Sequence, residues 1–535
     1  MKKRIISFLL CINLLVVLLC GRLFTLANEP QSASIGSGTR VKEIDVKRGM
    51  IYDRNLTPLV NNSYTTKLLI RPTNDALALL KANNCDNSII ENTVNGYFTI
   101  TDDFGSIALK NSNDIKAVKT YERYADSSLL HVIGYVDRSG KGVCGIEKHF
   151  DQYLTDCGGA LSVAYSTDAT GRMLLNEEVE IRNEGYYNKE GIVLTIDKET
   201  QKITENALLS NGITTGAAIV TDTRSGEILA CASLPVYDRD NLADYVNRDD
   251  SPFINRAFTP YPLGSIFKIV TSAAALENGI TPPDFYCAGN ITKSGTTFNC
   301  SNLAGHGHID FDTAVAKSCN PYFIDLGVKT GGDKITSTAL KIGFGVSTDL
   351  GNGLSSEKGI LPSPDDLNSD ASVGNFSFGQ GKLTATPLQV ASLMTIIAND
   401  GFSKEPKLIA GFTDDKGNFT PNLENSSREI LKKETCLAIK AAMAETVKTG
   451  TGKAAFSSLY TCCTKTATAQ SGQYNTDGSE VMYCWFAGFF PAENPRYAIC
   501  VMNENGVSGG GDCGPVFKKI AEQIIVLERM KNISE

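Results

Sequence analysis

The chain has 535 residues, of which 42% are hydrophobic and 21% are charged, and it contains 48 glycines. This length and composition indicate a globular protein of two or three domains and exclude the disordered, fibrous and polytopic membrane classes. The net charge is -8, and the sequence has no concentrated basic face. Nucleic acid is therefore not expected as a partner, because phosphate binding requires clustered positive charge.

The N-terminus has the pattern of an export signal. Basic residues at positions 2–4 precede an apolar run over residues 5–20, and a shorter apolar stretch continues to Ala27. We predict that residues 1–27 form a retained signal anchor, a single transmembrane helix that keeps the basic end in the cytosol and the rest of the chain outside. Cleavage after Ala27 is the alternative, since small residues stand at the required spacing there.

The next segment combines short apolar runs with many turn residues. We expect residues 28–190 to form an elongated, mixed α/β pedestal or dimerisation-like module. Within it, we interpret Arg48, Asp53 and Arg54 as an ion-paired structural hub. From residue 191 onward an apolar strand pattern changes into a helical pattern, which indicates a strand that enters a helix at a domain boundary.

Residues 191–535 are expected to form the larger domain, and the fold class of the whole chain is α+β. Residues 217–223 and 227–233 predict a β-hairpin, because two strand-like runs flank a turn. Three further strands and a final amphipathic helix are expected at residues 464–470, 481–491, 496–503 and 515–531. Since the strands come from both ends of the domain, they predict one antiparallel five-stranded sheet flanked by helices.

Fifteen cysteines are a high count for an exported chain. Most stand singly in apolar segments, where a buried thiol behaves as a small hydrophobic residue. Cys287 and Cys300 differ, since they bracket a short loop that a disulfide can close. We favour this disulfide over two free thiols, and place last a zinc site made from Cys287, Cys300 and a histidine, His306 or His308. The expectation is thus that the chain binds no metal and no cofactor.

The strongest chemical motif is the S-x-x-K sequence formed by Ser265 and Lys268. It opens a helix that Gly279 ends. At such a helix start, unpaired backbone N–H groups and the helix dipole favour a serine alkoxide and an oxyanion. Because the two residues share one helix face, a buried Lys268 with lowered proton affinity can take the proton of Ser265. The simpler alternative is a capping Ser265 beside a solvent-facing Lys268, since the motif often occurs by chance.

The chain contains only four histidines, which leaves few candidates for a histidine base and favours a lysine. An S-x-N motif lies between two expected helices about fifty residues after the serine. There Ser318 can relay a proton between lysines, and Asn320 can bind a substrate amide. By itself this short motif also fits an ordinary loop.

A basic residue on an edge strand beside the serine would complete this set of catalytic groups, and the sequence offers two candidates. Lys448 begins a K-T-G sequence, but it ends a helix and enters a Gly-rich turn. Lys465 begins a K-T-A sequence on a strand rich in β-branched residues. We choose Lys465, because a strand edge can present a lysine and hydroxyls to a groove.

Taken in order, the three motifs resemble those of the penicillin-recognising serine transpeptidases and β-lactamases. Further segments along nearly the whole chain are similar to class B penicillin-binding proteins, among them RGMIYDRN, HVIGYVD, GIVLTIDKETQ, NFSFGQGKLTATPLQVASLM and WFAGFFPAENPRYAICV. The resemblance implies a catalytic domain with the β-lactamase/transpeptidase-like fold. It also implies a D,D-transpeptidase that cross-links peptidoglycan and is covalently inhibited by β-lactams.

The resemblance assigns four catalytic residues. Ser265 is the nucleophile that the D-Ala-D-Ala end of a stem peptide acylates, and an amine from a neighbouring strand then resolves the acyl-enzyme. Lys268 is the general base, and Ser318 and Lys465 complete the proton path.

Asn320 would hold a substrate amide, and Thr466 and Thr468 the terminal carboxylate. The oxyanion hole would consist of the backbone N–H groups of Ser265 and Thr468. The third motif of the family usually ends in glycine, so Ala467 adds a methyl group where the substrate backbone passes. We expect acylation to be retained, since a strand alanine can point behind the sheet.

The implied partners are stem peptides, β-lactams, the membrane and a membrane-embedded glycosyltransferase that polymerises the glycan strands. The implied location is the cell membrane, with a single pass and the catalytic domain outside. The alternatives are an anchored β-lactamase, a D,D-carboxypeptidase, a penicillin-sensing receptor and an inert wall-synthesis scaffold. The long N-terminal module argues against a β-lactamase, and the intact Ser265, Lys268 and Lys465 argue against an inert scaffold.

Overall fold

A computed structural model describes residues 38–103, 112–124, 128–422, 427–474 and 478–534, together with Val16 and Leu19. The predicted anchor at residues 1–27 lies outside the described residues apart from these two. Among the helices within the described ranges, none combines the length and the apolar character that crossing a membrane requires.

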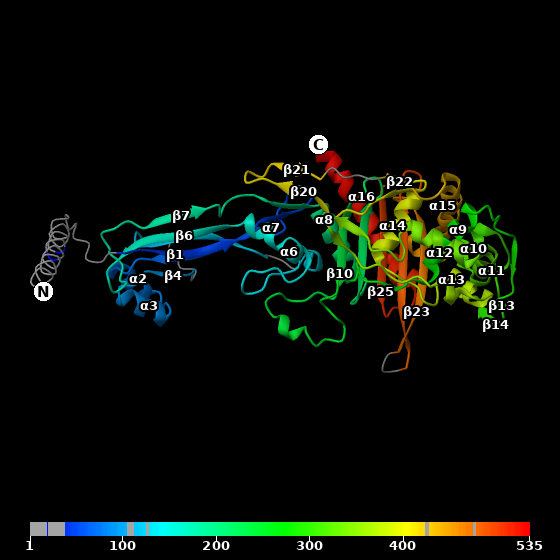
Figure 1. Cartoon of the computed structure of the whole chain (residues 1–535), viewed down its shortest axis with the longest axis horizontal. Helices are drawn as coiled ribbons and strands as arrows, with labels where there is room; N and C mark the ends of the chain where they lie inside the picture. The colour runs from blue at the N-terminus through cyan, green and yellow to red at the C-terminus, as the bar shows by residue number, and fades with distance from the viewer. Residues whose placement is uncertain are drawn as a thin grey trace, which may run out of the picture. The chain divides into compact units, whose positions relative to one another are not determined.

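The chain divides into two compact units (Figure 1). Unit 1 holds the described residues within 38–47, 63–122 and 159–187, and unit 2 those within 48–62, 123–158 and from 188 onward. The boundary expected near residue 190 lies beside the junction at 187 and 188. Two earlier segments of the chain also belong to unit 2.

In its described part, unit 1 contains two antiparallel sheets and two helices. The sheets have the strand orders β1 (Gly38–Lys47), β6 (Gly159–Thr167), β7 (Glu180–Glu184) and β4 (Thr99–Asp102), β3 (Ser63–Ile70), β5 (Ile115–Glu122). The helices are α2 (Asn74–Ala82) and α3 (Asn87–Val94). Successive side chains on β3 point to opposite faces, so Leu68 and Ile70 pack with Leu80 of α2 while Leu69 packs with Val163 of β6.

The central sheet of unit 2 has five antiparallel strands among the described residues, as the sequence predicts. Their order is β10 (Ile228–Leu234), β9 (Gly216–Asp222), β25 (Tyr497–Glu504), β24 (Glu480–Phe490) and β23 (Cys463–Tyr474). The predicted hairpin thus supplies one side of the sheet and the three late strands supply the other. Strand β23, which carries the K-T-A motif, lies at the edge.

Unit 2 also contains a smaller sheet and several short β-ladders. The smaller sheet has the order β2 (Met50–Tyr52), β8 (Gly191–Leu194), β20 (Ile409–Thr413), β21 (Phe419–Pro421), with β2 and β8 parallel. The ladders are β11 (Tyr261–Pro262) with β18 (Thr384–Ala385), β12 (Phe285–Cys287) with β15 (Gly307–Ile309), β13 (Asn290–Lys293) with β14 (Thr296–Asn299), β16 (Asp349–Gly351) with β17 (Leu354–Ser355), and β19 (Phe402–Lys404) with β22 (Ser427–Glu429).

The helices of unit 2 include some that pack on the central sheet and some that lie to one side of it (Figure 1). They are α5 (Leu130–Ile133), α6 (Gly145–His149), α7 (Asp151–Asp156), α8 (Lys198–Ser210), α9 (Phe267–Glu277), α10 (Phe311–Lys317), α11 (Asn320–Thr330), α12 (Gly332–Ile342), α13 (Asp370–Ser377), α14 (Pro387–Ala398), α15 (Lys433–Lys448) and α16 (Gly514–Ser534). Short 3-10 turns η1 (Leu242–Asp244), η2 (Gly264–Ile266), η3 (Pro364–Leu367) and η4 (Lys453–Ala455) and the π-type turn η5 (Gly509–Cys513) join them.

Successive side chains of the strands point to opposite faces of the central sheet, so a hydrophobic core lies on each face. On β9, Ile219 packs into one core with Ile269 of α9, and Val220 packs into the other with Phe517 of α16. Because the inner strands β9, β25 and β24 bury apolar side chains on both faces, helices can cover the sheet on both sides. The face toward α9 is the one that carries the S-x-x-K motif.

A buried ion-pair cluster holds the early segments of unit 2 together. Arg48 Nε donates to the fully buried Glu147 at 3.2 Å, and Arg123 Nε donates to the same carboxylate at 2.8 Å. The ion-paired part of the predicted hub is therefore centred on Arg48. Asp53 instead accepts backbone N–H groups of the following turn, and Arg54 pairs separately with Glu227 at 3.1 Å.

Replacing Glu147 by alanine should lower the free energy of unfolding by about 3–5 kcal/mol. The change leaves the buried guanidinium of Arg123 without its carboxylate and removes one of the two carboxylates that Arg48 contacts. Urea unfolding followed through the single tryptophan, Trp485, measures this change. Glu445→Ala is the matched control, since Glu445 pairs with Lys448 on the exposed surface of α15, and it should change stability by less than about 1 kcal/mol. Equal effects of the two variants would contradict the prediction.

Candidate active site

Ser265 lies on a tight turn at the start of α9. The residue before it, Gly264, has φ 61° and donates its N–H to the carbonyl of Gly379 at 3.0 Å. A Cβ atom added to Gly264 would lie 3.1 Å from the Cβ of Ala469 on β23. Glycine is therefore required both by the left-handed backbone and by the close approach, and the turn places Ser265 against the edge strand.

The segment before the serine is also held by the sheet. Trp485 of β24 is fully buried and donates its indole N–H to the carbonyl of Pro262 at 2.9 Å. Pro262 in turn pairs with Thr384 in the short ladder of β11 and β18. A rigid aromatic donor thus fixes the backbone three residues ahead of Ser265.

Lys268 is fully buried in the first turn of α9 and points at the S-x-N motif. Its Nζ donates to the carbonyl oxygen of Ser318 at 2.7 Å, to Ser318 Oγ at 3.1 Å and to Asn320 Oδ1 at 2.7 Å. Burial disfavours the charged ammonium and lowers the pKa of Lys268 to about 7. At neutral pH a substantial fraction of Lys268 is consequently a free amine.

Lys465 approaches the same hydroxyl from the edge strand. Its Nζ is fully buried and donates to Ser318 Oγ at 2.9 Å and to the carbonyl of Thr466 at 2.8 Å. Burial, and then the nearby charge of Lys268, hold the pKa of Lys465 well below its usual range. Within the described part of the chain neither lysine forms a salt bridge with a carboxylate. The states in which the two lysines together carry fewer than two positive charges are therefore favoured.

Ser318 is placed between the lysines by an unusual backbone conformation. It ends α10 in the left-handed region, with φ 55° and ψ 44°. Few residues other than glycine adopt this region, and such strain occurs frequently at functional sites. Asn320 opens α11 immediately afterwards, and its Nδ2 donates to the carbonyl of Asn299 at 3.0 Å. The turn thus aims a hydroxyl, a carbonyl and an amide at Lys268.

An open pocket of about 570 Å³ lies beside these groups. Its lining contains six of the eight predicted site residues, namely Ser265, Ser318, Asn320, Thr466, Ala467 and Thr468. The other two, Lys268 and Lys465, lie buried and reach the lining through Ser318. All eight residues that the sequence singles out are therefore brought together.

The pocket has further walls that the sequence interpretation missed. Thr451 Oγ1 lies 2.6 Å from Thr466 Oγ1, and Gly509 donates its N–H to Thr468 Oγ1 at 3.2 Å. A Cβ atom at Gly509 would lie 2.3 Å from the carbonyl oxygen of Ala467, so only glycine allows this loop to pack on β23. The run of glycines after the last strand was the available signal for this wall.

Ala467 occupies the position where glycine was expected. Its side chain is 3% exposed, and its Cβ lies 3.4 Å from the point where a Cβ of Gly264 would stand. The methyl group thus packs beneath the turn that carries the serine. Lys448, the rejected alternative to Lys465, is on the surface of α15 and pairs with Glu445 at 3.7 Å.

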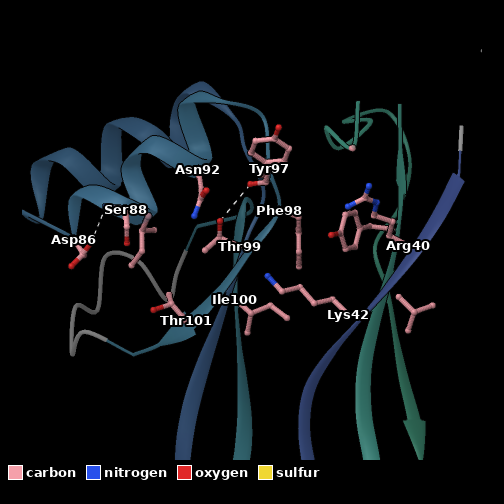
Figure 2. Close-up of a pocket in the computed structure, with 14 residues that line it drawn as sticks. Arg40, Lys42, Asp86, Ser88, Asn92, Tyr97, Phe98, Thr99, Ile100 and Thr101 are labelled. Atoms are coloured by element: carbon pink, nitrogen blue, oxygen red, sulfur yellow. Dashed lines mark hydrogen bonds between the residues drawn. The ribbon is translucent and has the colours of Figure 1, made fainter. Parts of the chain in front are cut away.

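A second hollow of about 740 Å³ lies within unit 1 (Figure 2). Arg40 and Lys42 of β1 stand on one side of it, and Asp86 and Ser88 at the start of α3 on the other. None of the site residues predicted from the sequence lines this hollow.

The favoured disulfide between Cys287 and Cys300 is not formed, and both residues carry free thiols. A disulfide would need the two sulfur atoms in covalent contact, whereas here they belong to a larger cluster with His306 and Cys319. Cys319 was not considered for this cluster, because nothing in its sequence spacing links it to the loop between Cys287 and Cys300.

A serine on a helix-start turn, next to two buried lysines at the edge of an antiparallel sheet, defines a serine acyltransferase. Residues 216–522 match the family described as penicillin binding protein transpeptidase domain. This match spans more than half of the chain, so the chain belongs to the penicillin-binding protein transpeptidase family.

Individual relatives agree with this family. Stage V sporulation protein D of Bacillus subtilis (strain 168) is 28% identical over 548 residues, which cover 94% of this chain and 82% of that protein. Peptidoglycan D,D-transpeptidase FtsI of Buchnera aphidicola is 28% identical over 437 residues, which cover 77% of this chain and 71% of that protein. The crystal structure of penicillin binding protein 3 from Mycobacterium tuberculosis complexed with ampicillin has the same fold, with a TM-score of 0.65 at 24% identity, covering 92% of this chain and 96% of that one.

Gly264→Ala should destabilise unit 2 more than Gly279→Ala. Both glycines have positive φ, 61° and 70°, so each substitution carries a backbone cost of about 1–2 kcal/mol. A Cβ at Gly279 meets open space, whereas one at Gly264 presses on Ala469. Urea unfolding of the two variants isolates the packing of the serine turn on β23. Equal losses of stability would show that this contact is not tight.

Proposed function

We propose that the pocket beside Ser265 is the active site of a D,D-transpeptidase that cross-links peptidoglycan. The observation that carries this proposal is the pair of buried lysines that share the hydroxyl of Ser318 next to a helix-start serine. A buried amine with a pKa of about 7 can act as a base at neutral pH. The family of the chain and the printed name of its relative FtsI support the substrate class.

In the proposed acylation, Ser265 Oγ attacks the carbonyl carbon of the penultimate D-alanine of a stem peptide. The proton of the hydroxyl passes to neutral Lys268. The peptide bond breaks, and the departing nitrogen of the terminal D-alanine receives a proton through Ser318, which both lysines contact. An amine of a second stem peptide then attacks the ester, and Ser265 recovers its proton.

The proposed roles on the substrate side follow the polar groups of the lining. Asn320 binds a backbone amide of the donor peptide, and Thr466 and Thr468 bind its terminal carboxylate. The backbone N–H groups of Ser265 and Thr468 stabilise the oxyanion, each by about 3 kcal/mol. The buried position of the Ala467 methyl group supports acylation with alanine at this position.

We also propose where the enzyme works and with what. The basic and apolar N-terminal sequence supports a signal anchor at residues 1–27 and catalysis outside the cell membrane. The matched transpeptidase region supports a catalytic domain at 191–535 behind a non-catalytic module at 28–190. A membrane-embedded glycosyltransferase that supplies glycan strands is the proposed partner.

Labelling with a fluorescent penicillin tests the nucleophile. The native chain should form a stable covalent adduct, and Ser265→Ala should form none. Ser301→Ala is the matched control, because Ser301 also lines the pocket but has no proposed part in the chemistry, and it should label normally. Label that persists on Ser265→Ala would overturn the assignment. Rapid spontaneous loss of label from the native chain would instead indicate a β-lactamase.

The rate of labelling should rise with pH between about 6 and 8 and then level off. Burial lowers the pKa of Lys268 to about 7, so the fraction of free amine grows as the pH passes this value. Lys268→Arg, which stays protonated, should label about 100- to 10,000-fold more slowly and without this dependence. A native profile that is flat over the interval would exclude Lys268 as the base.

A stem peptide ending in D-Ala-D-Ala, offered together with an amine acceptor, distinguishes the possible reactions. A transpeptidase releases D-alanine and joins the donor to the acceptor, whereas a carboxypeptidase releases D-alanine and leaves the shortened acid. Lys465→Ala should slow both product signals about 100-fold or more, because it removes one side of the proton path. Shortened acid without joined product would contradict cross-linking.

A further inference from the structure

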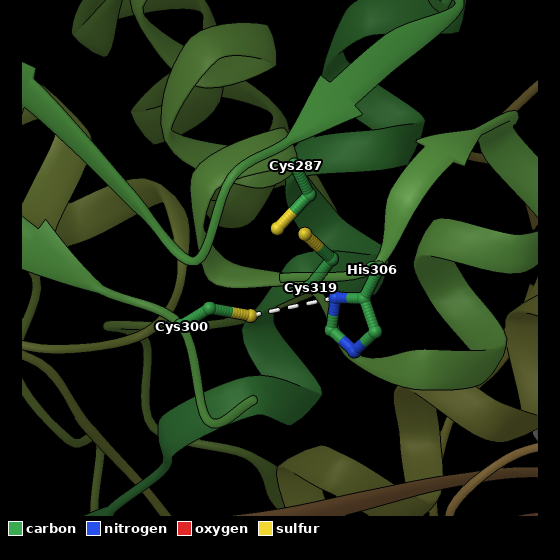
Figure 3. A group of neighbouring side chains, drawn as sticks. All are labelled: Cys287, Cys300, His306 and Cys319. Atoms are coloured by element: carbon green, nitrogen blue, oxygen red, sulfur yellow. Dashed lines mark hydrogen bonds between the residues drawn. The ribbon is translucent and has the colours of Figure 1, made fainter. Parts of the chain in front are cut away.

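Three thiols and one imidazole converge at Cys319, the middle residue of the S-x-N motif (Figure 3). Cys287 ends β12, Cys300 follows β14, His306 precedes β15 and Cys319 precedes α11. One ligand atom from each of the four lies within 4.8 Å of every other. The three cysteines are buried, with exposed fractions of 1%, 2% and 0% in chain order. Residues separated by up to thirty-two positions in the sequence thus point their donor atoms at a common centre.

The spacing of these atoms suits tetrahedral metal coordination. Zinc binds thiolate sulfur at about 2.3 Å and imidazole nitrogen at about 2.0–2.1 Å, so a sulfur and a nitrogen on one tetrahedral zinc are about 3.6 Å apart. Cys300 Sγ and His306 Nδ1 are separated by 3.5 Å. Two sulfur atoms on the same ion would be about 3.8 Å apart. The ligand atoms of the cluster all lie within 4.8 Å of one another, so this distance is compatible with the cluster.

The loops that deliver these ligands are built for close packing. The cluster's loop residues Gly289 and Gly305 have φ of 94° and 80°. A Cβ at Gly305 would lie 2.2 Å from the carbonyl oxygen of Cys287, and a Cβ at Gly289 would lie 2.1 Å from that of Leu303. The N–H of Cys300 also donates to the carbonyl of Gly289 at 2.8 Å. The backbone around the ligand atoms is therefore closely packed.

We propose that Cys287, Cys300, His306 and Cys319 bind one zinc ion with structural, four-coordinate geometry. Three soft thiolates and an imidazole match the preference of zinc, and hard cations such as magnesium and calcium prefer oxygen. Four protein ligands leave no open position for water or substrate, so the ion does not take part in the reaction itself.

The site has a consequence for the S-x-N motif, and this consequence rests on the proposed function. Cys319 is the middle residue of the motif, and Asn320 bonds to the carbonyl of Asn299, the neighbour of Cys300. A zinc ion bound to Cys319 and Cys300 ties together the two segments that hold Ser318 and Asn320. These two cysteines are therefore positioning residues for the groups that contact Lys268.

Metal content of the purified full-length chain tests the site directly. Protein prepared without added metal and without chelator should carry one zinc ion per chain by inductively coupled plasma mass spectrometry. Cys287→Ala, Cys319→Ala and His306→Ala should lose the zinc. His308→Ala is the matched control and should keep the zinc. His308 is two residues from His306, but it lies outside the cluster and makes an edge-on contact with the exposed ring of Tyr286.

A second variant at the same position distinguishes the loss of a metal ligand from misfolding. His306→Cys offers a four-thiolate ligand set and should retain zinc, whereas His306→Ala should not. Replacement of the ion by Co²⁺ should give the intense visible absorption of tetrahedral cobalt with thiolate charge transfer in the near ultraviolet, and His306→Cys should shift these bands. Native protein without bound zinc, or peptide mapping that finds a disulfide among the three cysteines, would overturn the proposal.

The positioning role has its own readout. Removal of the zinc with a chelator should slow labelling by the fluorescent penicillin about 10- to 100-fold, because small displacements of catalytic groups have effects of this size. Added Zn²⁺ should restore the rate in the native chain and in His306→Cys, but not in His306→Ala. An unchanged rate after removal would overturn the positioning role. A native chain that contains zinc but never labels would instead refute the proposed function and leave the metal site standing.

Discussion

The structure of the site depends on one electrostatic constraint, the burial of two lysine side chains against a single serine hydroxyl. Lys268 and Lys465 each donate to Ser318 Oγ, so their nitrogens lie no more than about 6 Å apart. At an effective dielectric constant of about 20, two positive charges at this distance repel by about 3 kcal/mol. Desolvation adds to this repulsion, and the pKa of both amines falls. The same arrangement that is costly for a charged pair is what provides a free amine at neutral pH.

Such a pair can persist only where the surrounding fold fixes it. Lys268 is held by α9, whose first turn is pressed onto β23 through Gly264, and Lys465 is held by the sheet pairing of β23 itself. Ser318 supplies the acceptor from a strained left-handed turn between α10 and α11. Each of the three groups thus comes from a different element, and each element is packed into the core on the same face of the sheet. The stability of the whole layer offsets the local cost.

Local patterns predicted the parts of this arrangement that are local in sequence. The strands were readable because alternation and turn residues mark them, and helix α9 because Ser265 and Gly279 bound it. Strand context also separated Lys465 from Lys448. What could not be predicted depends on contacts between distant segments. Thr451 and Gly509 reach the pocket through packing on β23, and Cys319 joins Cys287 and Cys300 only because β12, β14 and α11 converge. The expected disulfide is wrong for that reason, because a pair was inferred where the fold brings three thiols and an imidazole together.

The residues of the S-x-N motif therefore have two different environments. Ser318 and Asn320 face the lysines, where hydrogen bonds must be able to exchange a proton during the reaction. Cys319, between them, is fully buried and lies in a cluster with two further thiols and an imidazole. Proton exchange requires side chains that can change partners, but effective catalysis requires that their positions vary little. A fixed anchor on the residue between Ser318 and Asn320 reconciles these demands, because it restrains the backbone and leaves both functional side chains able to change hydrogen-bond partners.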